Sequence, residues 1–419
     1  MIWGMNTAIA ALIGLAIAII LIVVKVSPVY SLIMGALAGG LLSGFGLAGT
    51  VDVMIGGVKD ITPAILRILA AGVLSGALIK TGAAASISRT IVSRLGQKQV
   101  YLALALSAML ICGVGVFVDV AVITVAPIAL ILAQKLRLPK GKILLAMIGG
   151  AKCGNIISPN PNTIIAAENY SAPLSSVMAA NIIPALTGLL VTVYLIVPLM
   201  PSRKDEVLYD VGEDFADGDV PPFWASAAGP LVTVLLLALR PLFSVVVDPL
   251  VALPVGGLVC IIATRQFRNA GVCLTYGLEK MSVVAILLVG TGTIAGVIKA
   301  SEIKDVLLAL LSGSGLGGVL LAPVSGMLMA AATASTTAGA TIASAAFASS
   351  VVGVSPVWAA AMTNASCTVL DHLPHGSFFH ATGGSVAMAF RDRLRLVPFE
   401  SLVGLVLTAG SVLSCLLLR

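Results

Sequence analysis

Long apolar stretches constrain this chain more than any other feature. Several exceed the roughly 20 apolar residues that cross a hydrocarbon core about 30 Å thick, among them residues 7–26, 175–200 and 224–247. Only 10% of the 419 residues are charged and 59% are hydrophobic, which is far from the composition of soluble globular domains. Because these runs are continuous rather than alternating, the sequence predicts an all-α polytopic membrane protein and not a barrel.

The N-terminal residues 1–6 carry no basic group and precede no small-residue cleavage site. We therefore expect the first helix to be retained rather than removed as a signal peptide, in a multi-pass protein of the bacterial inner (plasma) membrane with lipid around it. The six cysteines are scattered without a CxxC pair, which argues against a disulfide framework. The net charge of +6 fits basic cytoplasmic loops, so no nucleic-acid partner is expected.

One hydrophilic segment divides the chain. Residues 201–222 hold seven of the 18 acidic residues together with several prolines and glycines, a composition typical of a linker. The predicted organisation is a first membrane repeat at 1–200, a cytoplasmic acidic linker at 201–222, and a second membrane repeat at 223–419.

Three pairs of similar segments support this division, in the same order in both halves. They are GVLSGALIK (72–80) with GTIAGVIK (292–299), FVDVAVITVAP (117–127) with TASTTAGATIAS (333–344), and AMIGGAKC (146–153) with AMTNASC (361–367).

Basic residues flank the apolar stretch 101–132 on both sides. They are Arg89, Arg94 and Lys98 before it, and Lys135, Arg137, Lys140 and Lys142 after it. Both flanks should therefore be cytoplasmic. Two legs of about 16 residues reach only about 24 Å each, so we predict a re-entrant hairpin whose tip lies near Gly113, Gly115 and Asp119. Its counterpart, residues 316–352, lies in a region without Lys or Arg and should face outward.

Each half is thus predicted to hold about five spanning helices and one hairpin. An odd number of crossings inverts the second repeat relative to the first and places both termini outside. After each hairpin, ISPNPNT (157–163) and LDHLPHGS (370–377) should break a helix at the membrane midplane. Such breaks must line protein or a water-filled cavity.

Hairpin tips and unwound helices that meet at the midplane would offer free N–H groups to a carboxylate. The substrate-binding candidates are Asn155, Ser158, Asn160, Asn162, Thr163, Thr333, Ser335, Thr336, Thr337, His375, Gly376 and Ser377. The alternative is that these small polar residues only allow close helix packing.

Acids and histidines deep in a membrane are candidates for proton coupling. The proton-coupling candidates are Asp119, Asp371, His372 and His375. Asp119 could instead cap a helix, and the histidines could be hydrogen-bonded fillers of the unwound stretch. Lys152 is a possible counter-charge for the substrate, with snorkelling to an interface as the alternative.

No motif for an enzyme is present: the sequence lacks a phosphate loop, HExxH and GxSxG. The histidine spacing resembles no strong metal motif. We therefore expect no catalytic residues, no bound metal and no cofactor beyond a coupling ion, H⁺ or possibly Na⁺.

Three segments carry a family resemblance. FVDVAVITVAPIAL (117–130), TASTTAGATIASAA (333–346) and PHGSFF (374–379) resemble the gluconate permease (GntP) family of the ion-transporter superfamily. The resemblance implies proton-coupled symport of a small organic anion, such as gluconate or a hydroxycarboxylate like 3-hydroxybutyrate. It also implies a homodimer with an elevator mechanism. The alternative is a sodium-coupled, citrate-like carboxylate transporter or a cation/proton antiporter of the same superfamily. His375 and Ser377 depart from the gluconate transporters, which leaves the substrate open.

Overall fold

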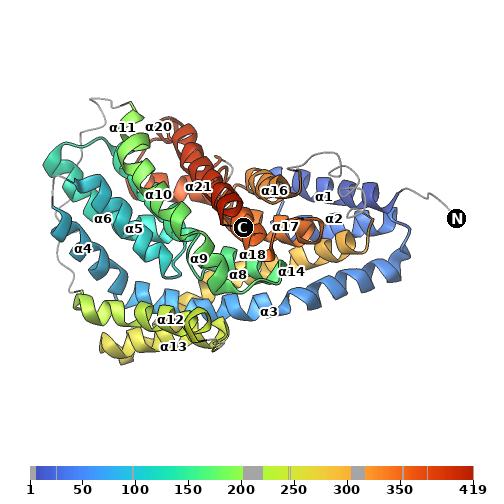
Figure 1. The fold of residues 1–419 in the computed structure, drawn as a ribbon, viewed down its shortest axis with the longest axis horizontal. Coiled ribbons are helices and arrows are strands. Elements are labelled where there is room, and N and C mark those ends of the chain that lie inside the picture. The colour runs from blue at the N-terminus through green and yellow to red at the C-terminus, as the bar shows by residue number, and fades with distance from the viewer. Residues whose placement is uncertain are drawn as a thin grey trace.

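The structure is a computed structural model that describes residues 6–418, apart from 25, 97–98, 202–219, 244, 246, 303–316, 352 and 375. Every regular element in those ranges is a helix, which confirms the all-α prediction. The predicted linker, 201–222, lies almost wholly outside the described residues. Figure 1 shows an elongated molecule that is broad around α4–α7 and narrow at α1 and α2.

The two halves present their helices in the same order. The first half comprises α1 (Thr7–Val23), α2 (Pro28–Leu42), α3 (Gly46–Lys80), α4 (Ala83–Leu95), α5 (Val100–Gly113), α6 (Val118–Leu136), α7 (Lys140–Asn155), α8 (Pro161–Asn169), α9 (Leu174–Ala180), α10 (Ile182–Val191) and α11 (Val197–Leu199). The second comprises α12 (Phe223–Phe243), α13 (Pro249–Ala263), α14 (Ala270–Lys299), α16 (Gly317–Thr333), α17 (Thr336–Phe347), α18 (Pro356–Ser366), α19 (Ser377–Ser385), α20 (Phe390–Leu394) and α21 (Val397–Leu417). Each half runs through a helix pair, a long helix, a hairpin, a broken helix and a closing helix. The first half has α4 between the long helix and the hairpin, whereas residues 303–316 of the second half lie outside the described ranges.

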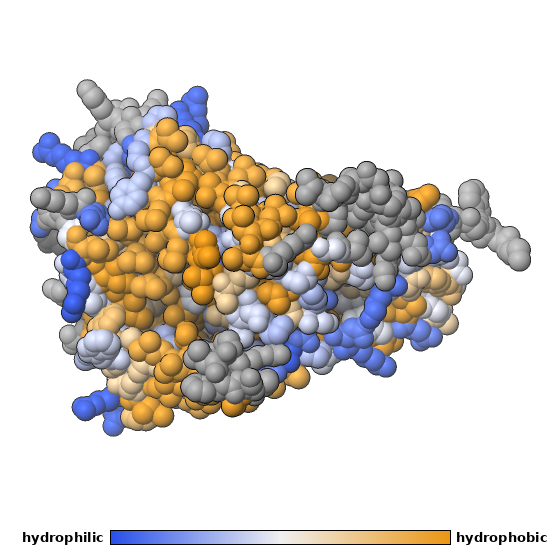
Figure 2. All heavy atoms as spheres, in the orientation of Figure 1, coloured by the Kyte–Doolittle hydropathy of each residue, from blue (hydrophilic) through white to orange (hydrophobic). Residues whose placement is uncertain are grey.

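Many of these helices suit a bilayer. Four stretches are long and apolar enough to cross a membrane by length and composition: Gly46–Lys80, Leu174–Leu199, Phe267–Lys299 and Phe390–Leu417. The helix α6 bends by 49° between Ala126 and Ile128 and is either a broken fifth span or part of a re-entrant loop. The other apolar helices found in the described ranges have 10–17 residues. In Figure 2, apolar side chains cover most of the visible face and hydrophilic ones gather at its margins. The apolar part of this face is therefore suited to contact with lipid.

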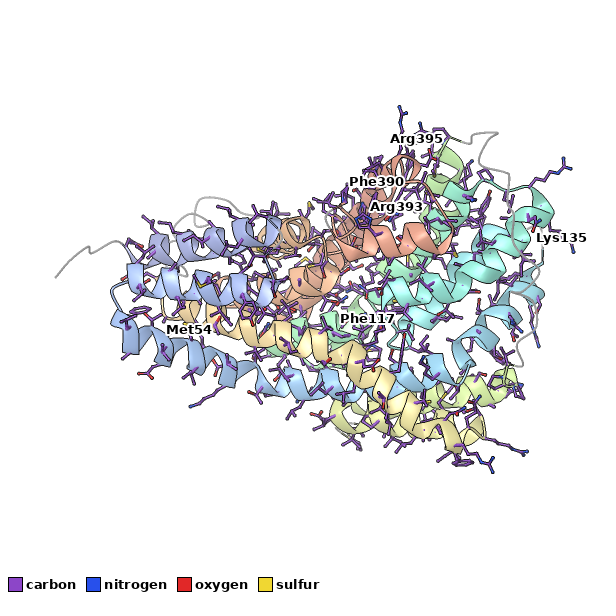
Figure 3. All side chains as sticks on the ribbon, turned by 180° about the vertical axis from the view of Figure 1, so that it is seen from behind. Met54, Phe117, Lys135, Phe390, Arg393 and Arg395 are labelled. Carbon is purple, nitrogen blue, oxygen red and sulfur yellow. The ribbon has the colours of Figure 1, made fainter. Side chains whose placement is uncertain are left out.

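The two longest helices form the spine of the molecule. In Figures 1 and 3, α3 and α14 run side by side along one edge. A Cβ atom added to Gly57 would lie 2.0 Å from the Gly292 carbonyl oxygen, and one added to Gly277 would lie 2.0 Å from that of Gly72. Only glycine allows this approach, as at other small-residue helix crossings.

The contacts between α3 and α14 are reciprocal. Gly57 meets Gly292 and Gly296 on α14, while Gly277 meets Gly72 and Gly76 on α3. These two Gly-x-x-x-Gly pairs belong to the segments matched as repeats, GVLSG and GTIAG. Exchange of equivalent contacts between antiparallel helices is what a two-fold axis produces. Inversion of the halves across a membrane stays a prediction.

Candidate functional site

Two hairpin turns and two broken helices lie near the centre of the molecule, and each of these interruptions has a local backbone feature. Gly115, with φ +108°, separates α5 from α6. Pro159 and Pro161 remove backbone donors between α7 and α8. Ala334, with φ +45°, separates α16 from α17. The fourth interruption, between α18 and α19, contains Pro374.

A new helix begins after each interruption, and all four N-termini border one cavity of about 140 Å³. Its lining residues are Phe117, Val118, Asp119, Asn155, Asn162, Ala334, Ser335, Thr336, Thr337, Asp371 and Phe378. Figure 3 places Phe117 near the centre of the molecule. The free N–H groups and the dipole of a helix N-terminus favour negative charge. The cavity is therefore suited to a small anion.

Amide side chains form one wall. Asn160 and Asn162 both donate to Asn155 Oδ1, at 2.5 and 3.0 Å, and Thr337 donates to Asn162 Oδ1 at 2.6 Å. The last bond joins the two halves of the chain. Asn155 Nδ2 is buried without a hydrogen-bond partner, a costly state that a bound ligand would relieve.

Asp371 also lines the cavity, and it belongs to a buried ion pair. Thr336 Oγ1 donates to Asp371 Oδ2 at 2.6 Å, and Lys152 Nζ lies 2.7 Å from Asp371 Oδ1. Lys152 also donates to the Thr368 carbonyl oxygen at 2.5 Å and is fully buried. It therefore lies behind Asp371 and is not among the residues that line the cavity.

Asp119 lies in the first turn of α6, where Val120 N–H donates to its Oδ1 at 2.9 Å. Within the described part of the chain, no ion pair to this carboxylate is present. The cavity thus has one acid with a direct ion pair, Asp371, and one, Asp119, for which the described residues supply none.

Other predicted residues lie around the cavity rather than on it. Asn160 caps α8 through Thr163 N–H at 3.2 Å, and Asn364 donates to Thr163 Oγ1 at 2.9 Å. Ser158 Oγ is buried without a partner, and Thr333 Oγ1 donates to the Met329 carbonyl oxygen.

The α19 N-terminus supplies the remaining predicted residues. A Cβ atom at Gly376 would lie 2.4 Å from the Ala334 carbonyl oxygen, so Gly376 packs against the tip of the α16–α17 hairpin. His375 and the side chain of Ser377 lie outside the described residues.

Two charged residues near the site were not predicted as part of it. Arg393 donates to both carboxylate oxygens of Glu400, and both side chains are fully buried. Arg393 lies on the short helix α20, and in Figure 3 its side chain lies further inside the protein than that of the neighbouring Arg395. The position of Glu400 within an apolar helix was the available sequence signal.

A second ion cluster lies away from the cavity lining. Arg67 on α3 donates to Asp248 Oδ1 and Oδ2, at 3.1 and 2.8 Å, and pairs with Glu168 at the end of α8. The hydrogen bonds from Arg67 lower the pKa of the Asp248 carboxyl, which lies before α13. Arg67 therefore ties three elements together.

Comparison with known proteins assigns the family. Residues 6–382 match the GntP family permease. The chain belongs to this family. It is 53% identical over 409 residues to an uncharacterized transporter of Haemophilus influenzae, with 97% of each chain covered. It is 25% identical to a gluconate permease of Pseudomonas aeruginosa, covering 91% of this chain and 92% of that one.

A solved structure shares the fold. The YdaH transporter of Alcanivorax borkumensis, described as having an unusual topology, superposes with a TM-score of 0.62 over 90% of each chain. At 15% identity this likeness shows the fold alone. Family membership and the apolar helices make this protein a membrane transporter.

Proposed function

We propose that this protein is a proton-coupled symporter that carries a small hydroxylated carboxylate anion across the bacterial inner membrane. The observation that carries the proposal is the convergence of four helix N-termini on one cavity. Their partial positive charges and free N–H groups would hold the carboxylate. The unpartnered Asn155 Nδ2 adds a side-chain donor.

The two acids that line the cavity support coupling to protons. An anion that enters beside the charged carboxylates of Asp119 and Asp371 would be repelled. Lys152 balances Asp371, but no cation is paired with Asp119 among the described residues. A proton on Asp119 would remove one negative charge and supply an O–H donor. Anion and proton would therefore bind together.

The volume and the polar lining of the cavity also indicate the size and chemistry of the substrate. Its volume of about 140 Å³ is below the roughly 300–1,000 Å³ of pockets for drug-sized ligands. Ser335, Thr336, Thr337 and the amides can exchange hydrogen bonds with hydroxyl groups. A sugar acid fits this chemistry, in line with the relative named gluconate permease.

The test is uptake of labelled acids into proteoliposomes, with proton and sodium gradients imposed separately. The panel is D-gluconate, glycerate, 3-hydroxybutyrate, citrate and D-serine. We expect accumulation of a hydroxycarboxylate under an inward proton gradient and none under a sodium gradient alone. Accumulation driven only by a sodium gradient would show that sodium, and not the proton, is the coupling ion. Failure of all five under both gradients would reject the carboxylate assignment.

A further inference from the structure

A chain of buried ionisable residues extends from the cavity wall into the protein. Lys152, Asp371, His372, Arg393 and Glu400 are each 1% exposed or less. Ionisable groups inside a membrane protein are costly and commonly serve function. The proposed function uses only the cavity end of this chain, and it gives Arg393 and Glu400 no role.

The members of the chain are in contact from end to end. Asp371 Oδ1 lies 3.0 Å from His372 Nδ1, which in turn lies 4.0 Å from Glu400 Oε2. Arg393 holds Glu400 through both carboxylate oxygens and is itself fixed, since Nε donates to the Phe379 carbonyl oxygen at 3.2 Å. His372 is therefore placed between two carboxylates.

The surroundings of His372 provide partners for both of its charge states. Nε2 lies 3.0 Å from the Val397 carbonyl oxygen, which can only accept, so Nε2 carries a hydrogen. Nδ1 lies 3.0 Å from both Lys152 Nζ and Asp371 Oδ1. A neutral ring accepts from Lys152 at Nδ1, whereas a protonated ring donates to Asp371 there. The His372 ring can thus take up or release one proton at Nδ1 with only a small movement of its neighbours.

The charges around the ring are balanced when it is neutral. The charged groups that face it are Lys152 from α7, Asp371 from the preceding position, Glu400 from α21 and, through Glu400, Arg393 from α20. Two cations and two carboxylates cancel. A proton on His372 adds one positive charge, which the carboxylates of Asp371 and Glu400 stabilise and the Lys152 ammonium, 3.0 Å from Nδ1, opposes.

We propose that Glu400, oriented by Arg393, is a positioning residue for proton coupling, because it stabilises the protonated form of His372, whose Nδ1–H then donates to the Asp371 carboxylate at the cavity wall. Uptake of one proton at Nδ1 converts the neutral ring into an imidazolium that faces this carboxylate. The inference rests on the proposed proton coupling. It extends the coupling unit to residues that do not line the cavity.

The experiment follows His372 directly by NMR in the full-length protein. The chain has three histidines, so ¹⁵N-histidine labelling in lipid nanodiscs, without a histidine tag, gives few signals. The signal missing in His372→Gln assigns the ring. We expect Glu400→Gln to lower the pH midpoint of this titration by about 1–3 units, the usual effect of an opposite charge about 4–6 Å away. Glu400→Asp should recover part of that shift.

Two further variants separate this effect from general damage. Arg393→Gln/Glu400→Gln removes the carboxylate without stranding a charge, and it replaces the single variant if Glu400→Gln does not fold. Asp248→Asn breaks a carboxylate–arginine pair outside the chain and should leave the midpoint unchanged. An unchanged midpoint in both Glu400→Gln and Arg393→Gln/Glu400→Gln, or a His372 ring that shows no titration, would overturn the inference. No substrate is needed, so failure of the uptake panel is a separate result.

Discussion

At the scale of single residues, the structure separates groups that the sequence presents as equivalent. Asp119 and Asp371 are both acids beside predicted helix breaks, yet among the described residues only Asp371 forms an ion pair, with Lys152 at 2.7 Å. Lys152 in turn does not line the cavity. The two acids should therefore respond differently to substitution.

Asp119→Asn removes a proton site without altering the neighbouring ion pair. We expect loss of accumulation driven by a proton gradient, because the amide cannot take up a proton. Exchange of labelled for unlabelled substrate, which needs no net proton movement, should persist. Proteoliposome uptake and counterflow measure the two activities. Intact accumulation in this variant would remove Asp119 from the coupling mechanism.

Lys152→Met leaves the Asp371 carboxylate buried without its cation. Breaking a buried pair on one side costs about 3–5 kcal/mol, whereas replacing both partners with apolar residues often costs little. We expect a large fall in thermal stability for Lys152→Met and a smaller one for Lys152→Met/Asp371→Leu. Thermal unfolding in detergent compares them. Equal losses in both variants would show that the unpaired Asp371 carboxylate is not the cause of the destabilisation.

At the scale of elements, the site depends on close contact between helix ends that are distant in sequence. Gly376 at the start of α19 touches Ala334 at the tip of the α16–α17 hairpin. Glycine has no Cβ, so the hairpin tip can lie directly against the α19 N-terminus. This contact helps to place Thr336 and Asp371 on one wall of the cavity.

Gly376→Ala tests this contact. The added Cβ would lie 2.4 Å from a backbone oxygen, so the hairpin and α19 must separate. We expect substrate affinity to fall by roughly tenfold or more, since about 1.4 kcal/mol of lost contact energy suffices for that change. Gly384→Ala is the control. Gly384 lies on α19, and nothing lies within 4 Å of a Cβ atom added there. Comparable affinity in both variants would show that the contact does not support the site.

At the scale of the whole molecule, α3 and α14 join the two halves through reciprocal glycine contacts. Their close crossing holds one half of the chain against the other through backbone packing, without polar side chains. Figure 3 shows both helices extending along most of the molecule. Damage at this crossing should therefore affect the entire fold.

Gly57→Ala places a Cβ atom 2.0 Å from the Gly292 carbonyl oxygen. We expect destabilisation of about 1–3 kcal/mol, the usual range for overpacking a core, and reduced transport. Gly56→Ala changes the adjacent residue, where nothing lies within 4 Å, and should behave like the wild type. Thermal unfolding and uptake on the same preparations compare them. A stable Gly57→Ala variant would mean that the crossing relaxes without cost.

Much of the architecture was predictable from local sequence. Apolar length predicts helices in lipid, because a bilayer leaves backbone groups no external partner. Gly115 and the prolines of SPNP (158–161) predict where helices stop, since each limits the local backbone. The cavity lining includes the predicted residues Asp119, Asn155, Asn162, Ser335, Thr336, Thr337 and Asp371. These features depend on neighbours in the chain.

The sequence by itself thus determined that this protein lies in a lipid bilayer, that it is helical, the order of its similar segments and the positions of its helix breaks. Only the tertiary structure decided which polar groups face the cavity and which face each other. Lys152 meets Asp371 across 219 positions of chain, and α20 turns Arg393 inward to Glu400. Such pairings depend on how whole helices pack, which no local pattern of residues specifies.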